Sequence, residues 1–119
     1  MKENDKLRRA EIIKSLLKVG LTETEAYVYL QLAKEGPQKA ADIGKALKMY
    51  KQRLYRSLRK MQSKGVITTS GYPARFSAVP FEQVLDLAIK SNIEEAERMM
   101  QNKEALLSSW RSIRDKIKS

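Results

Sequence analysis

Apolar positions recur at helical spacing through the first third of the chain, and this pattern predicts two helices. The first has a candidate cap at Asp5 and an apolar stripe along one face. The stripe consists of Leu7, Ala10, Ile13, Leu16 and Leu17. The second helix begins at Thr22, because Thr22 and Glu25 form a Thr-x-x-Glu capping box, and it ends at Gly36, just before a proline.

Two more helices are predicted between residues 40 and 64. The first is short, residues 40–47, and the second runs from about Tyr50 to Lys64. In the second, Leu54, Leu58 and Met61 recur at the spacing of a buried helical stripe. A short helix joined to a longer one by a turn of about three or four residues is the helix-turn-helix arrangement.

The hydrophobic period changes from helical to alternating after Gly65. Residues 66–69 are rich in β-branched side chains, residues 70–74 have turn composition, and residues 75–79 read as a returning strand. A hairpin directly after the second helix of a helix-turn-helix is the wing of a winged helix. We therefore expect residues 1–79 to form a winged helix-turn-helix domain of mainly α (α+β) class.

The chain after Pro80 contains no glycine or proline and predicts one long helix over residues 80–119. Its heptad a and d positions are Ile89, Asn92, Ala96, Met99, Lys103, Leu106, Trp110, Ile113 and Ile117, and Ile93, Met100 and Leu107 widen the stripe.

A lone helix cannot cover such a stripe, so we expect these residues to form the interface of a homodimeric coiled coil. The alternative is a helix that folds back onto its own domain. Trp110 could instead be a platform for base stacking, but its heptad position favours the helix–helix core. The pattern leaves the parallel or antiparallel sense open.

The net charge of +10 is concentrated in one segment. Residues 37–79 hold 10 basic residues and one acidic residue, Asp42. Residues 1–36 have 7 basic and 6 acidic residues, and residues 80–119 have 7 of each. A segment with such an excess of basic residues indicates a polyanionic partner, because release of phosphate counterions drives such binding. The favoured partner is double-stranded DNA.

The composition removes most catalytic chemistry. The chain has no cysteine and no histidine, so disulfides, thiolate nucleophiles, Cys/His zinc sites and imidazole catalysis are excluded. We expect no enzyme activity, no cofactor and no bound metal. No apolar run is long enough to span a membrane, and the N-terminus lacks the apolar region of a secretory signal, so we expect a cytoplasmic, nucleoid-associated protein.

The helical wheel of residues 50–64 places a cationic face opposite the apolar stripe. We expect its N-terminal part to enter the major groove and its later cations to meet phosphates. The candidate groove contacts are Lys51, Gln52, Arg53 and Arg56; the candidate phosphate contacts are Arg59, Lys60 and Lys64. Further candidate DNA contacts are Lys39, Lys45, Tyr50, Tyr72 and Arg75, whereas Tyr55 is interpreted as half-buried packing.

Five segments resemble the winged-helix domain of TrmB-type transcriptional regulators, which are best known in archaea. They are LTETEA (21–26), ADIGKAL (41–47), LYRSL (54–58), KGVI (64–67) and GYPARFSAVP (71–80). The resemblance implies a DNA-binding regulator. It departs from the family at Lys48, where glycine is frequent, at Gly44, where alanine is usual, and at Arg56, where an acidic residue is frequent. The family's large effector-binding domain is not expected within these residues, so no small-molecule effector is predicted.

The favoured function is that of a dimeric DNA-binding transcriptional regulator. A sequence-nonspecific architectural or chromatin protein is the main alternative, and a protein-interaction module is a weaker one. RNA binding is disfavoured because the stacking aromatics expected on a sheet face are missing.

Overall fold

The computed structural model describes residues 2–118, and six helices and one two-stranded sheet lie within that range. The elements are α1 (Lys2–Lys18), α2 (Glu23–Glu35), α3 (Ala40–Leu47), α4 (Lys51–Ser63), β1 (Ile67–Ser70), β2 (Arg75–Ala78), α5 (Phe81–Gln101) and α6 (Lys103–Lys118). Packing divides them into two compact units, Met1–Asp86 and Leu87–Ser119. The fold is mainly helical with a two-stranded antiparallel wing, which confirms the predicted class.

Helix α1 packs on α2 through its C-terminal half only. Leu16 is fully buried and Ile13 is half-buried, whereas Leu7 is 64% exposed and Leu17 is 43% exposed. Only the C-terminal part of the predicted stripe is therefore buried, because no described residue packs over the first turns of α1. Asp5 does not cap the helix either, since α1 already includes it in the first turn.

Helix α2 begins with the predicted capping box. The backbone N–H of Glu25 donates to Thr22 Oγ1 over 3.2 Å, and the backbone N–H of Thr22 donates to Glu25 Oε1 over 2.9 Å. Two of the donors that every helix start leaves unpaired are thus satisfied. Ala26, Tyr29 and Leu32 of this helix are buried in the core.

Helices α3 and α4 form the predicted helix-turn-helix. The stripe of α4 is confirmed, because Leu54, Leu58 and Met61 are all buried. On α3 the buried side chains are Ala40 and Ile43. These apolar faces meet below the turn, so the polar side of α4 points to solvent.

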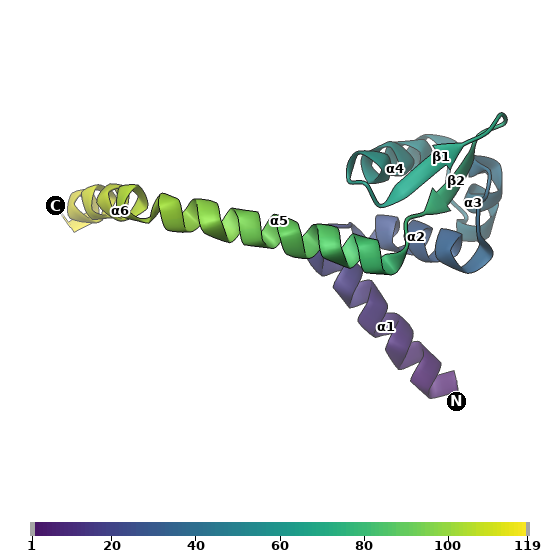
Figure 1. The fold of residues 1–119 in the computed structure, drawn as a ribbon, viewed down its shortest axis with the longest axis horizontal. Helices are drawn as coiled ribbons and strands as arrows, with labels where there is room; N and C mark the ends of the chain where they lie inside the picture. Colours follow the sequence, from purple (N-terminus) through teal and green to yellow (C-terminus); the bar gives the residue numbers. More distant parts are fainter. Residues whose placement is uncertain (1, 119) are drawn as a thin grey trace. The chain divides into compact units, whose positions relative to one another are not determined.

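The hairpin follows α4 and packs on the same core (Figure 1). Its ladder pairs Ile67 with Ala78 and Ser70 with Arg75, and Phe76 is the buried residue of β2. On the outer side of β2, Phe76 also exchanges two backbone hydrogen bonds with Gln38, of 3.0 Å and 2.8 Å. The turn-proximal part of β2 is therefore joined to the segment that leads into α3.

The boundary between the two units falls inside α5, later in the chain than the predicted boundary at residue 80. Val84 is buried in the core of the first unit, and Phe81 packs against that core. The first turns of α5 therefore belong to the winged-helix unit.

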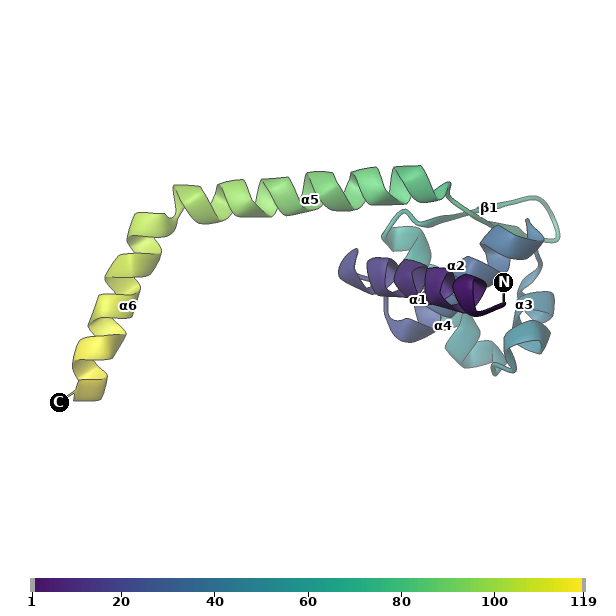
Figure 2. The same ribbon diagram turned by 90° about the horizontal axis from the view of Figure 1, so that it is seen from below.

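The second unit contains a break that the sequence pattern does not predict. Helix α5 ends at Gln101 and α6 begins at Lys103, so Asn102 interrupts the expected single helix (Figure 2). Asparagine has a low helix propensity and is favoured at helix starts, which suits it to this position. Arg98 in the last turn of α5 and Glu104 in the first turn of α6 also match the dipoles of two separate helices.

Candidate nucleic-acid interface

Helix α4 presents its cations on two flanks and an outer side. With Leu54 set inward at about 100° per residue, Gln52 and Arg56 point most directly away from the core. Arg53 and Lys60 lie on one flank, and Lys51, Tyr55 and Arg59 lie on the other. Every candidate residue of α4 is exposed.

The first flank packs toward the start of α2. Arg53 Nη2 donates to Thr24 Oγ1 over 2.9 Å, so this guanidinium is directed toward α2. Lys64, which follows α4, donates to the Gly20 carbonyl over 2.9 Å and to Glu25 Oε1 over 2.8 Å. Lys64, which the sequence analysis expected to meet phosphate, thus pairs its ammonium group with a buried carboxylate in the structure.

Glu25 is 1% exposed and its charge is compensated locally. Burial by itself raises the pKa of the Glu25 carboxyl, but the hydrogen bonds from Lys64 and Thr22 outweigh it, and the pKa is lowered from 4.5. Glu25 Oε2 is buried and makes no hydrogen bond within the described residues. The ion pair thus ties the end of α4 to the turn between α1 and α2.

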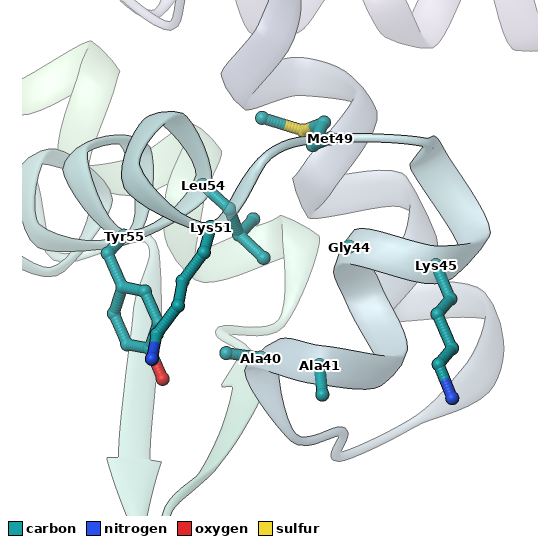
Figure 3. A pocket seen from close by; sticks show the side chains of 8 residues that line it. All are labelled: Ala40, Ala41, Gly44, Lys45, Met49, Lys51, Leu54 and Tyr55. Atoms are coloured by element: carbon teal, nitrogen blue, oxygen red, sulfur yellow. The ribbon is translucent and has the colours of Figure 1, made fainter.

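The second flank borders a hollow of about 420 Å³ between α3 and α4 (Figure 3). Ala40 and Ala41 line one side, Leu54 and Tyr55 line the other, and Lys45 stands at its edge. Lys51 Nζ lies 5.9 Å from the centroid of the Tyr55 ring, within the range of a cation–π contact. Tyr55 is 37% exposed, which is more open than the half-buried packing that the sequence analysis expected.

Close packing between α3 and the turn that follows it forms one wall of the hollow. A Cβ on Gly44 would lie 3.3 Å from the Met49 carbonyl oxygen and 3.5 Å from Leu54 Cδ2. Lys48, which ends α3, has φ 54° and ψ 48°, the left-handed conformation that glycine adopts most readily.

The hairpin brings two distant cations together. The antiparallel bridge pairs Gln38 with Phe76, so Lys39 and Arg75, the residues next to that pair, lie on adjoining segments. Arg75 is exposed and Lys39 is half-buried. Neighbouring like charges favour a polyanion that neutralises both. At the tip Tyr72 is fully exposed, as is most of Tyr50 at the start of α4.

The structure thus gathers Lys45, Lys51, Gln52, Arg56 and Arg59 on adjoining surfaces of α3 and α4, which we call the α3–α4 face. It does not place Arg53 or Lys64 there, since both contact residues 20–25. The sequence analysis missed Thr24 as the partner of Arg53. Only tertiary contacts between α2 and α4 reveal that bond.

The described residues hold no cluster of three or more Asp and Glu side chains with the arrangement of a metal site. Within the same part of the chain, none of the helices has the length and hydropathy needed to cross a bilayer.

Residues 16–82 match the model of a protein family described as the sugar-specific transcriptional regulator TrmB. The chain is 36% identical over 90 residues to the HTH-type sugar sensing transcriptional regulator TrmBL1 of Pyrococcus furiosus. The match covers 75% of this chain and 26% of that protein, so the chain spans about a quarter of the relative's length.

Two solved structures show the same fold. A possible transcriptional regulator from Methanosarcina mazei Go1 has a TM-score of 0.63 at 18% identity, covering 81% of this chain and 86% of that one. The transcriptional regulator Tm0710 from Thermotoga maritima has a TM-score of 0.57 at 16% identity, covering 98% of this chain and 90% of that one.

Proposed function

This chain belongs to the TrmB family of transcriptional regulators, and we propose that it binds double-stranded DNA through the α3–α4 face and the hairpin. The observation that carries the proposal is the exposure of Lys51, Gln52, Arg56 and Arg59 on α4 beside Lys45 of α3. An α-helix of this kind fits the major groove of B-DNA. Family and fold are those of transcription regulators rather than of enzymes.

The proposed contacts fall into two groups, those that recognise bases and those that bind phosphates. Gln52 and Arg56 project furthest from the core, and these side chains pair bidentately with adenine and guanine. Lys45, Arg59 and Lys60 meet phosphates, which fix position without reading sequence. Lys39 and Arg75 contact the backbone beside the hairpin, with Tyr72 at its tip and Tyr50 at the start of α4. Arg53 reaches DNA only by leaving Thr24.

The active form in this proposal is a homodimer joined through α5 and α6. Ile89, Ile93, Trp110 and Ile113 are each more than half exposed in the single chain. Contiguous apolar surface of this extent marks an interaction site. Residues 80–119 then act as the dimerisation segment, and the protein works in the cytoplasm on the nucleoid, without a cofactor.

The test is the salt dependence of binding to duplex DNA. The logarithm of the binding constant should fall linearly with the logarithm of salt concentration, with a slope near −0.9 per phosphate neutralised. Arg59→Ala should reduce the magnitude of that slope by about 0.9. Lys90→Ala, which removes an exposed charge from α5, is the matched control and should leave the slope unchanged. A binding constant independent of salt in the unaltered chain would contradict the proposal.

A second test separates sequence reading from nonspecific binding. Arg56→Ala should narrow the affinity gap between a preferred duplex and random DNA, by about 1–3 kcal/mol if Arg56 pairs with guanine. Arg53→Ala should change that gap much less. Equal affinity of the unaltered chain for all duplexes would favour the architectural alternative, whose binding needs only phosphate contacts.

A further inference from the structure

The exposed apolar stripe of α5 and α6 is not covered from within its own helical unit. Of residues 89–117, only Leu107 is even half-buried, and all the others are exposed. One residue, Asn102, separates α5 from α6. Two antiparallel helices need a connection of about two to five residues, so α6 cannot fold back along the α5 of its own chain. The stripe must therefore be covered by a surface outside this helical unit.

The charges of the two helices differ in sign. Helix α5 (Phe81–Gln101) has five acidic and two basic residues, for a net charge of −3. Helix α6 (Lys103–Lys118) has two acidic and five basic residues, for a net charge of +3. The neutral balance of residues 80–119 therefore hides an acidic helix followed by a basic one.

A parallel pair would place α5 against α5 and α6 against α6, with like charges opposed in both halves. An antiparallel pair centred near Asn102 would place each acidic α5 against the basic α6 of the other copy. Like charges that face each other across an interface oppose association, and complementary charges select partner and orientation. The charge pattern therefore favours the antiparallel pair.

The break also fixes the register. Two interrupted helices pack along their whole length only when their breaks coincide, which places Asn102 of both copies beside the twofold axis. In the single chain a hollow of about 480 Å³ spans the junction of α5 and α6, and its lining includes Met99, Asn102 and Leu106 together with Glu95 and Arg98. Asn102 thus lies on the same side as two residues of the apolar stripe.

From these observations, and resting on the proposed dimer, we infer that α5 and α6 bind a second copy of this chain in antiparallel sense. Each α6 lies along the α5 of its partner, with the twofold axis next to Asn102. In the a-to-d layers of this register, Ile89 faces Ile113 of the partner subunit and Ala96 faces Leu106 of the partner subunit. The second contact sets a small side chain against a large one.

The absence of cysteine allows a direct test by single-cysteine cross-linking of the full chain. Ile89→Cys and Ile113→Cys are made separately, mixed, allowed to exchange subunits and oxidised. The inference expects disulfide dimers in the mixture, approaching half of all dimers, and almost none in either variant alone. Disulfide dimers in each variant alone, with the mixture cross-linking only copies of the same variant, would show a parallel pair and overturn the inference.

Glu94→Cys and Ser108→Cys are the matched control, because both lie at the outer heptad position and should not cross-link alone or mixed. Sedimentation of the same variants tests the proposed homodimer separately from its antiparallel sense. A dimer that cross-links in the parallel pattern leaves the proposed homodimer intact. A monomer at micromolar concentration removes both the homodimer and the inference, while salt-dependent DNA binding is measured independently of either.

Discussion

The buried carboxylate of Glu25 holds the ammonium group of Lys64 in an ion pair. Its Oε1 accepts hydrogen bonds from Lys64 and from the backbone of Thr22, which join the end of α4 to the start of α2. A buried charge that loses its partner is costly, so this pair holds both elements in place. Lys64 counts toward the basic segment in the sequence but adds little to the charge offered to DNA.

Replacing Glu25 by Gln should remove the pH dependence that this pair gives to stability. The folded-state pKa of Glu25 lies below 4.5, so its contribution is present above that pH and is lost as the pH falls through the folded-state pKa. The variant should be less stable than the unaltered chain near neutral pH, and the gap should close in acid. Urea unfolding from about pH 7 to about pH 3 measures it.

Glu23→Gln is the control, because Glu23 is an exposed neighbour in the same helix turn. A gap for Glu25→Gln that stays constant across the whole range would show that the carboxylate charge is not the stabilising feature.

Lys48→Gly should stabilise the winged-helix unit. A non-glycine residue in the left-handed region costs about 1–2 kcal/mol, and Lys48 is exposed, so little packing is lost. Part of the gain is offset because glycine makes the unfolded chain more flexible. A net gain of about 0.5–1 kcal/mol, or a few degrees in Tm, is expected from thermal unfolding. Lys48→Ala removes the same charge but keeps the Cβ, and an equal gain there would assign the effect to charge.

At the scale of elements, local sequence determines most of the winged-helix unit. The bounds of α3, the capping box of α2 and the turn of the hairpin follow from neighbouring residues, so pattern alone predicts them. The partners of Arg53 and Lys64 depend on how α2 packs against α4, and no local pattern encodes that contact. The break at Asn102 was missed because the heptad pattern continues across it.

In helix α1, the apolar pattern of the sequence and the burial of the side chains do not coincide. Leu16 and Leu7 stand on the same predicted stripe, yet Leu16 is fully buried and Leu7 is 64% exposed. Leu16→Ala should lower the free energy of unfolding by about 2–5 kcal/mol. Leu7→Ala should change it by less than about 0.5 kcal/mol. Equal losses in chemical denaturation would show that the stripe is buried along its whole length.

At the scale of the whole molecule, the two units have separate intrinsic probes. All five tyrosines lie between residues 27 and 72, and the single tryptophan, Trp110, lies in α6. The first unit has its own buried core, whereas the apolar side chains of α5 and α6 beyond residue 86 are mostly exposed. Stability of the second unit should therefore depend on association.

The expected result is two thermal transitions. The one followed by Trp110 fluorescence should move to lower temperature on dilution, because a dimer melts at a concentration-dependent temperature. The tyrosine near-ultraviolet signal should report a transition that hardly moves. Two signals that shift together on dilution would mean that the units unfold as one.

The bridge between Gln38 and Phe76 also determines which part of the hairpin is rigid and which part is flexible. Both amides donate to backbone carbonyls one ladder pair from the turn, whereas residues 71–74 form the turn outside the ladder. Amide hydrogen exchange should therefore be slow at Gln38 and Phe76 and fast at the tip. If the hairpin contacts DNA as proposed, a strand held firmly up to a free turn would let the tip adapt to grooves of different width, so DNA shape would set the tip's final position.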